Sequence, residues 1–267
     1  MGSPQRFPSG ISTGARGLPV GYMPVPDMTK WNYFSENFMG AIPVATSTAA
    51  TAVSAGWNIT NVVAGTTVGG GVTTTSGISV AGLAVAIQAS NTSAAYISST
   101  SSTANTRGNT VYLRKDKEVI LSFGYSIQTA LASKIIQIGL VQAADAPFSL
   151  PLLGMYWYSL GPIGNIYLSG TSAAVGPTIT TAVDSFMEVQ MRWKSNVLSG
   201  MYRRRSLTAG GTDTGWLSAG TVSTTGVGTD FDVANPKAVQ PFIGCSNGAA
   251  ATAATVIFDY YQLAIER

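Results

Sequence analysis

The feature that most constrains this chain is the alternation of apolar with polar or small residues at a period of two. It is longest over residues 118–127, where one face carries Val119, Leu121, Phe123, Tyr125 and Ile127. Because successive side chains of a strand point to opposite faces, this pattern predicts a strand with one face in a core. Residues 186–193 alternate in the same way, with Met187, Val189, Met191 and Trp193 on the apolar face.

The second alternating segment is expected to form half of a β-hairpin. Residues 197–204 return as its partner after a three-residue connection, 194–196, in which Asn196 supplies the positive φ that such a turn requires. Further strand patterns lie at 83–89, 135–141 and 255–265, and helical periodicity is nowhere convincing. Ten or more strands with Gly- and Thr-rich turns predict an all-β fold. We expect a two-sheet antiparallel jelly-roll sandwich over residues 33–267, preceded by an extended N-terminal arm, 1–32.

The composition favours a weakly charged surface. Charged residues make up 10% of the 267 residues, against about 25% in an average soluble protein. Little repulsion therefore separates neighbouring copies, and the surface is suited to dense packing. The one dense basic run is Arg203, Arg204 and Arg205. It is either a phosphate contact or the solvated end of a strand, and we expect no nucleic-acid partner.

The residue inventory leaves little room for catalysis. The chain has no histidine and a single cysteine, Cys245, so histidine-based catalysis, a zinc site and an intramolecular disulfide are excluded. The cysteine is expected to be a buried filler. Only four glutamates occur, and Glu188 has no second acid on its strand face, where a glycosidase needs two flanking carboxyl groups. We expect no enzyme, no catalytic residue, no cofactor and no metal.

The sequence also bears on a calcium site and on a transmembrane helix. Asp213, Asp230 and Asp232 either contribute oxygen ligands to a calcium ion or form turns, and their spacing fits no calcium loop. No run of 18 apolar residues occurs, so no transmembrane helix and no membrane partner are expected.

The N-terminal arm is not expected to build a core of its own. Its prolines and glycines exclude a helix and a central strand and leave an extended path, which can reach roughly 90 Å. It carries spaced apolar side chains, which a disordered segment usually lacks, and a flexible leader is the alternative interpretation. The arm is therefore interpreted as a strap that binds in a groove of another subunit. Its expected contact residues are Arg6, Phe7, Pro8, Arg16, Tyr22, Met23, Asp27 and Trp31.

A cluster of aromatic residues at 156–158 is open to two interpretations. Trp157 and Tyr158 either stack on sugar rings from an exposed sheet face, or alternate between core and surface. The sequence leaves both interpretations open.

Two stretches resemble known families. Residues 241–245 and 255–265, with a strand that reaches a glycine and then an apolar–Asp–aromatic strand, resemble the end of concanavalin-A-like jelly rolls. The opening "RFPSG" at 6–10 and the join at 26–38 resemble the start of tailed-bacteriophage virion proteins, although Met28, Ser35 and Asn37 depart from that pattern.

The second resemblance implies a head decoration, or cement, protein. Such a protein would be a homotrimer on the outer surface of the capsid, with its arm clamping neighbouring copies of the major capsid protein and stabilising the shell. The alternative is a carbohydrate-binding virion fibre or adhesin that uses the jelly roll as a lectin. A glycan depolymerase is the least favoured interpretation because paired acids are scarce.

Overall fold

The computed structural model describes most of the chain from residue 111 onward and shorter segments before it. The described residues are 5–6, 12–13, 29–36, 38, 51–52, 57–61, 67–75, 78–87, 89, 94–98, 111–127, 133–142, 148, 150, 153–169, 173–182, 184–208, 210–223, 237–248 and 252–267. They form strands, turns and loops, and no helix occurs among them. This part of the chain accordingly contains no helix that could span a bilayer.

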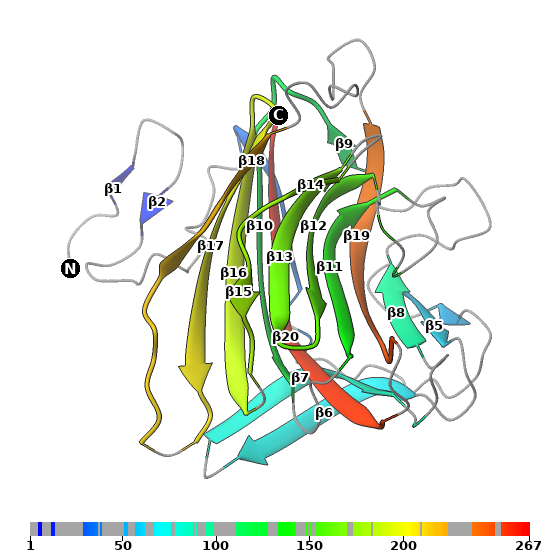
Figure 1. The fold of residues 1–267 in the computed structure, drawn as a ribbon. Helices are drawn as coiled ribbons and strands as arrows, with labels where there is room; N and C mark the ends of the chain where they lie inside the picture. Colours follow the sequence, from blue (N-terminus) through cyan, green and yellow to red (C-terminus); the bar gives the residue numbers. More distant parts are fainter. Residues whose placement is uncertain are drawn as a thin grey trace.

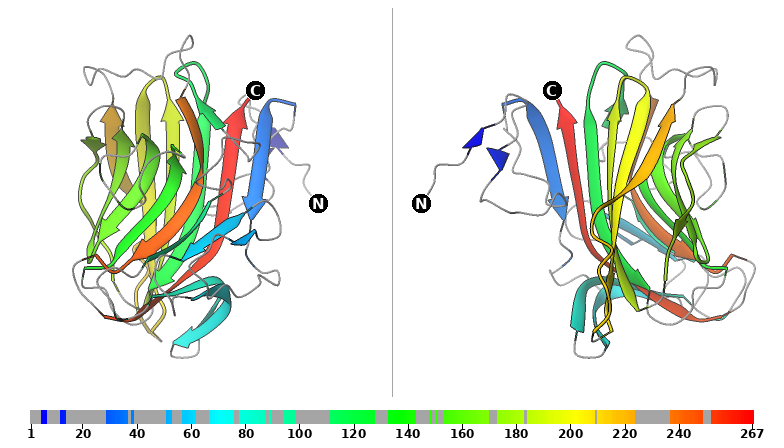
Figure 2. Two further views of the ribbon diagram at one scale, coloured as in Figure 1. Left: turned by 90° about the vertical axis from the view of Figure 1, so that its right-hand side faces the viewer. Right: turned by 60° about the vertical axis from the view of Figure 1, so that its left-hand side comes forward.

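Two antiparallel sheets pack face to face, as Figures 1 and 2 show. The first sheet has eight strands. Seven of them follow one another in the order β18 (Leu217–Ser223), β17 (Val197–Ser206), β16 (Ser185–Lys194), β10 (Val119–Ile127), β20 (Ala254–Glu266), β7 (Ile78–Ile87) and β6 (Thr67–Thr75). The eighth strand, β3 (Trp31–Glu36), also pairs with β20.

The second sheet has ten strands. In order these are β14 (Ala173–Val175), β13 (Ile163–Ser169), β12 (Gly154–Leu160), β11 (Ile135–Val141), β19 (Lys237–Ser246), β8 (Ala94–Ser98), β5 (Asn58–Asn61) and β4 (Thr51–Ala52), while β15 (Ile179–Thr180) pairs with β13 and β9 (Val111–Leu113) with β19. The predicted all-β, two-sheet jelly-roll sandwich is therefore confirmed.

The predicted hairpin is present, but its connection is shorter than expected. Lys194 pairs directly with Val197, so Ser195 and Asn196 alone form the turn, with φ angles of 52° and 62°. Two consecutive positive φ values define the turn type whose twist matches that of the flanking strands. The three-residue connection is thus wrong, whereas the positive φ at Asn196 is confirmed.

The inner faces of the two sheets form one core. Val119, Leu121, Phe123, Tyr125 and Ile127 all enter it from β10, as their alternation predicts. The predicted burial of Cys245 is also confirmed, and burial raises the pKa of its thiol. A thiol in such an environment stays protonated and behaves as a small apolar side chain.

Two hydrogen bonds cross this core from one sheet to the other. The indole Nε1 of Trp157, on β12, donates to the hydroxyl of Tyr125, on β10, at 3.0 Å. The hydroxyl of Tyr261, on β20, donates to the backbone carbonyl of Gly139, on β11, also at 3.0 Å. All of these groups are buried. A buried polar group without a hydrogen-bond partner costs free energy, and each of these bonds supplies such a partner.

The arm contains one element that its sequence did not predict. Strand β1 (Gln5–Arg6) pairs with β2 (Ser12–Thr13), which makes a short antiparallel pair within the segment expected to be extended throughout. The expected domain boundary at residue 33 falls inside β3, which pairs with β20 from Trp31 onward. The sandwich therefore begins at Trp31.

The Tyr261–Gly139 bond provides a test of how the sheets are joined. The substitution Tyr261→Phe keeps the ring but removes the hydroxyl that donates to the carbonyl of Gly139, so we expect the free energy of unfolding to fall by about 0.5–1.5 kcal/mol. Urea denaturation should show a lower midpoint with an unchanged slope. The control Tyr112→Phe, at a side chain 54% exposed, should leave the midpoint unchanged. Equal midpoints for Tyr261→Phe and wild type would show that the bond contributes nothing.

Candidate functional site

Most of the predicted arm contacts lie outside the described residues. This applies to Phe7, Pro8, Arg16, Tyr22, Met23 and Asp27. Arg6 lies in β1, where it pairs with Ser12. Their capsid-binding role stays a prediction.

Trp31 requires a correction. Its side chain is only 3% exposed and packs with Ile120 and Ala264 of its own chain. These residues lie on neighbouring strands, since Ile120 pairs with Ala264 and Ala264 pairs with Tyr33 on β3. A ring that is buried within its own sheet has no surface to offer a capsid subunit, so Trp31 is a structural residue of the sandwich.

The predicted glycan-stacking pair is divided between the two faces of β12. Trp157 is fully buried in the core, where its indole bonds Tyr125, so its predicted role in sugar stacking is wrong. Tyr158 lies on the opposite, outer face and meets Tyr167 edge to face at 5.7 Å. That outer face also holds Tyr156, stacked on Tyr167 at 5.3 Å. Of the two interpretations left open, alternation between the two faces of the strand describes Trp157 and Tyr158, and periodicity alone does not say which face is inside.

The outer face of the eight-stranded sheet holds the richest group of polar side chains. The register places Glu188 of β16 opposite Gly124 of β10, and Gly124 opposite Tyr260 of β20. The glycine is required there, because a Cβ would lie 2.5 Å from Cζ of Phe186 and 2.7 Å from Cε1 of Tyr260. Side chains from β16 and β20 consequently meet above β10.

A β-bulge turns one more side chain toward this group. Phe258 pairs with Tyr125 and Tyr260 pairs with Gly124, which leaves Asp259 as the extra residue of the bulge. Bulges redirect side chains in this way. Gly82 of β7 allows the bulge to approach closely, since a Cβ at this position would lie 2.1 Å from the carbonyl oxygen of Phe258.

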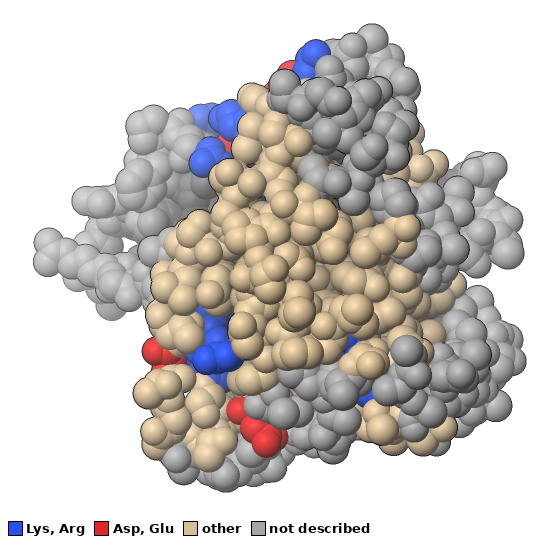
Figure 3. Space-filling model, viewed as in Figure 1, with Lys and Arg blue, Asp and Glu red and all other residues tan. Residues whose placement is uncertain are grey.

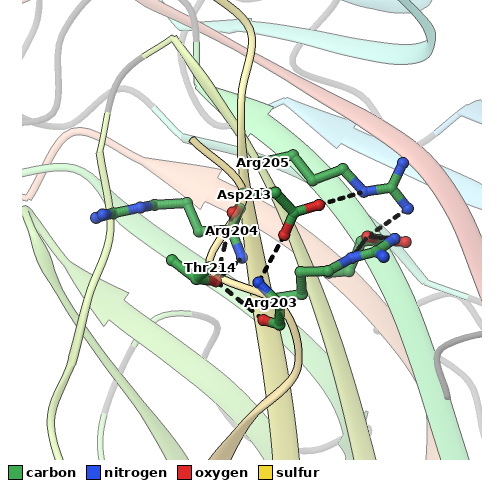
Figure 4. Close-up of polar contacts among 7 residues, drawn as sticks. Arg203, Arg204, Arg205, Asp213 and Thr214 are labelled. Atoms are coloured by element: carbon green, nitrogen blue, oxygen red, sulfur yellow. Dashed lines mark hydrogen bonds and ion pairs between the residues drawn. The ribbon is translucent and has the colours of Figure 1, made fainter. Parts of the chain in front are cut away.

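Glu188 is bound by two of the three arginines of the basic run. Nε of Arg203 donates to Oε2 of Glu188 at 2.6 Å, and Arg205 reaches the same oxygen through Nη2 at 2.9 Å. Arg205 also lies 3.8 Å from Asp213, as Figure 4 shows. Glu188 and Arg203 are 5% and 7% exposed, so this ion pair is buried. Neither interpretation of the run describes Arg203, which is a buried partner of an acid.

An aromatic side chain borders the ion pair. The guanidinium carbon of Arg203 lies 5.2 Å from the ring centroid of Trp216, within the range of a cation–π interaction. Trp216 is half-buried, and so are Asp259 and Tyr260. We call Glu188, Arg203, Trp216, Asp259 and Tyr260 the outer polar cluster.

Burial shapes the protonation of its acids. Burial raises the pKa of Glu188 above its ordinary value, although the bonds from Arg203 oppose this. Burial also raises the pKa of Asp259, and the nearby charge of Glu188 adds to the effect. Asp259 makes no hydrogen bond or ion pair with another described residue. Its carboxyl group thus has unused bonding capacity, and so does the indole Nε1 of Trp216, which has no hydrogen-bond partner among the described residues.

A second ion-paired acid lies farther along the same sheet. Glu118 accepts from Nε of Arg192 at 2.6 Å and from Nζ of Lys194 at 3.1 Å. Burial alone would raise the pKa of Glu118, but these two bonds outweigh it and the pKa is lowered. Arg192 and Lys194 are largely solvated, so this group contributes little as an interaction site.

The outer face of the ten-stranded sheet has a different character. Lys237 is the one charged residue within the ten strands of that sheet. Figure 3 accordingly shows a broad surface over β11 to β14 without Lys, Arg, Asp or Glu. Three exposed apolar side chains, Leu160, Ile163 and Val175, lie on β12, β13 and β14.

Of the three aspartates considered as calcium ligands, only Asp213 lies among the described residues. Asp213 lies beside Arg205, while Asp230 and Asp232 lie outside them. Where the chain is described, no group of three or more His, Cys, Asp and Glu side chains is placed to hold a metal ion.

The sequence did not predict the outer polar cluster. Glu188 was recognised as an acid on a strand face, but Asp259 comes from β20, more than 70 positions later. The apolar–Asp–aromatic pattern of 255–265 indicated only the end of a jelly roll. An aspartate between the aromatic residues Phe258 and Tyr260 of the terminal strand was the available signal.

The comparisons with known proteins concern the fold. No family model matches the chain, and no curated protein sequence matches it. Among solved structures, a protein of unknown function from Shewanella oneidensis MR-1 aligns with a TM-score of 0.51 and 11% identity, over 89% of this chain and 87% of that chain. A likeness at this identity shows the fold alone.

Two lectins align more distantly. Peanut lectin with a nine-residue peptide gives a TM-score of 0.49 at 10% identity, over 88% of this chain and 97% of that one. Basic winged bean lectin with Tn-antigen gives 0.44 at 10% identity, over 88% and 98%. These similarities carry no information about ligands of this chain.

The buried ion pair provides the test of the cluster. The substitution Arg203→Met leaves a buried carboxylate with one partner fewer, so we expect a loss of about 3–5 kcal/mol in the free energy of unfolding at pH 7. Since the folded pKa of Glu188 is raised, the loss should shrink as the pH falls toward the unfolded value near 4.3 and the acid becomes neutral.

Urea denaturation between pH 4 and 7 measures both effects. The matched control is Arg204→Met, at a side chain that makes no ion pair with a described residue, and its stability should be within about 0.5 kcal/mol of wild type. A loss for Arg203→Met that does not depend on pH would contradict the assignment to Glu188.

Proposed function

We propose that this protein is a non-catalytic, carbohydrate-binding jelly-roll protein and that its sugar site is the outer polar cluster. The observation that carries the proposal is Asp259. Its half-buried carboxyl group makes no hydrogen bond with a described residue and lies beside Tyr260 and near the Glu188–Arg203 pair. A carboxylate placed in this way is suited to accept hydrogen bonds from the hydroxyl groups of a sugar.

The neighbouring side chains supply the other contacts that a sugar requires. Ser122 of β10 pairs with Gln190 of β16 on one side and with Gln262 of β20 on the other. A row of amides therefore runs next to the row of Glu188 and Tyr260. Amides offer both donors and acceptors to hydroxyl groups, while the ring of Trp216 offers an apolar surface to the C–H side of a sugar.

The charge arrangement favours binding over hydrolysis. A glycosidase needs one carboxyl group to protonate the leaving oxygen and another to attack or to activate water. Two guanidinium groups bind the same oxygen of Glu188, so this carboxylate is engaged in ion pairs that hold the sheet together and is not available for either catalytic role. With Glu188 engaged, Asp259 remains the one acid of the cluster without a partner among the described residues.

The resemblance of residues 6–10 and 26–38 to virion proteins extends the proposal to location. We place the protein on a bacteriophage particle, as a fibre or adhesin that contacts host polysaccharide.

A glycan array probed with the full-length protein tests the sugar site. Wild type should bind a subset of glycans, and Trp216→Ala or Asp259→Asn should weaken that binding at least tenfold, about 1.4 kcal/mol. The control Tyr112→Ala removes an aromatic ring that is exposed on β9 of the other sheet and should bind as wild type does. Unchanged binding in both cluster variants, or no binding by wild type, would contradict the proposal.

A second candidate function, capsid decoration, is favoured by a different observation. Leu160, Ile163 and Val175 are 49%, 50% and 46% exposed on the uncharged outer face of the ten-stranded sheet. Exposed aliphatic side chains on a surface without charge are suited to contact with protein. In this candidate function the body lies against the major capsid protein on the outside of the shell, and the arm clamps neighbouring subunits.

Deletion of residues 1–30 tests the capsid role. The truncated chain keeps β3 and should remain folded, with an unchanged β-type circular dichroism spectrum, because β1 and β2 pair only with each other among the described strands. It should no longer sediment with capsids that the full chain decorates, because its arm contacts are gone and their avidity is lost. Equal sedimentation of the truncated and full chains would exclude the arm mechanism.

A further inference from the structure

A long part of this chain carries no charge at all. Between Glu36 and Arg107 there is no Asp, Glu, Lys or Arg, a gap of 70 residues, positions 37–106. At the average content of charged residues, about 17 would be expected there. The gap includes β4 to β8, which contribute to both sheets.

The β6–β7 hairpin within this gap extends past the sheet that it joins. β6 pairs with β7 along its whole length, from Thr67 opposite Ala86 to Thr75 opposite Ile78. β7 pairs with β20 only through Leu83–Ile87. The far part of the hairpin, residues 71–75 and 78–82, is therefore a two-stranded ribbon that pairs with no third strand among those described. Figure 2 shows the hairpin at the lower end of the molecule.

Such a ribbon is incomplete in two respects. A two-stranded antiparallel pair is marginally stable unless a third strand or a packed face supports it. In addition, β6 is the last strand of its sheet among those described, so one of its edges presents unpaired backbone N–H and C=O groups. Proteins usually protect such an edge with charged residues or proline, and the sequence of β6, TVGGGVTTT, contains neither.

We propose that the edge of β6 binds the same edge of a second copy of this chain in antiparallel orientation. The two eight-stranded sheets then continue into each other through a two-fold contact centred on the ribbon. This inference is independent of the proposed sugar site, and it gives a dimer where the virion resemblance implies a trimer.

The charge pattern favours a second copy over another partner. In a two-fold contact the same strand lies on both sides, and residues at the axis meet their own counterparts, so a charge near the centre of β6 would face the same charge. The absence of charge removes this repulsion. The backbone of an antiparallel edge is also complementary to itself, because donors and acceptors alternate in the same order on both copies.

The edge strand at the opposite end of the sheet supplies a matched control. β18 is also a terminal strand, and its Thr221 and Ser223 are exposed. However, β18 carries a β-bulge, since Gly200 of β17 pairs with Gly220 and Met201 with Ser218, which leaves Ala219 as the extra residue. A bulge protects an edge from further pairing, so β18 is not expected to pair.

Light scattering coupled to size exclusion tests the proposal on the full chain. Wild type should have about twice the 27.6 kDa mass of one chain. The double variant Thr73→Lys/Thr75→Lys places like charges on both copies and should weaken the dimer at least tenfold, and Thr73→Glu/Thr75→Glu should do the same. An equimolar mixture of the two variants should restore the dimer, because the facing charges are then opposite.

The control variant Thr221→Lys/Ser223→Lys should keep the wild-type mass. A monomeric or trimeric wild type would overturn the proposal, as would a dimer that withstands both double substitutions. A Lys and Glu mixture that stays monomeric would also overturn it, since each variant would then have lost the contact for another reason.

Discussion

The structure depends on the burial of two apolar sheet faces against each other. Each face comes from strands that alternate, and the large aromatic side chains of β10, β12, β16 and β20 fill the space between them. Two of these aromatics carry polar groups into the core and use them across the gap, Trp157 to Tyr125 and Tyr261 to Gly139. The hydrogen bonds fix which strands of the two sheets lie opposite one another, since a shift of either sheet would leave buried polar groups unpaired.

β20 connects this core to the outer polar cluster. Its inward residues, among them Phe258 and Tyr261, belong to the core, while Tyr260 lies on the outer face. The bulge at Asp259 adds a carboxyl group to that face without disturbing the inward residues on either side. Gly82 and Gly124 make the arrangement possible, because a side chain at either position would collide with β20 or with Phe186. The candidate site is thus built from one irregularity in a strand that is otherwise part of the core.

Charge is divided unequally over the molecule. Two acids in or next to the eight-stranded sheet, Glu188 and Glu118, are paired with arginine or lysine, whereas the strands of the ten-stranded sheet carry only Lys237 as a charged residue. The low overall charge that the composition showed is therefore a property of particular surfaces. One is the outer face of the ten-stranded sheet, and another is the ribbon of β6 and β7.

Much of the fold could be predicted from local patterns. The alternation at 118–127 and 186–193 predicted β10 and β16 and their inward residues, and the positive φ of Asn196 followed from its place between two strands. The length of this turn could not be predicted, because one turn residue more or less changes the register of the two strands but leaves the alternation of apolar residues unchanged. The short β1–β2 pair was missed because prolines and glycines on both sides of it indicate an extended path.

The site residues show where sequence reasoning ends. The choice between Trp157 and Tyr158 as the core residue depends on which face of β12 meets the other sheet, and the sequence of β12 is aromatic on both. The burial of Arg203 depends on Glu188 lying opposite it in the register of β16 and β17. The position of Asp259 near that pair depends on a bulge and on the order of strands β16, β10 and β20.

By itself, the sequence determined the fold class, the inward faces of the long strands and the scarcity of chemistry based on histidine and cysteine. These follow from periodicity and composition, which are local properties of the chain. The tertiary structure alone decided which aromatic rings are buried, which arginines pair with acids and which carboxyl group is left without a partner. These follow from contacts between strands distant in sequence, and no local pattern encodes the order in which strands lie side by side.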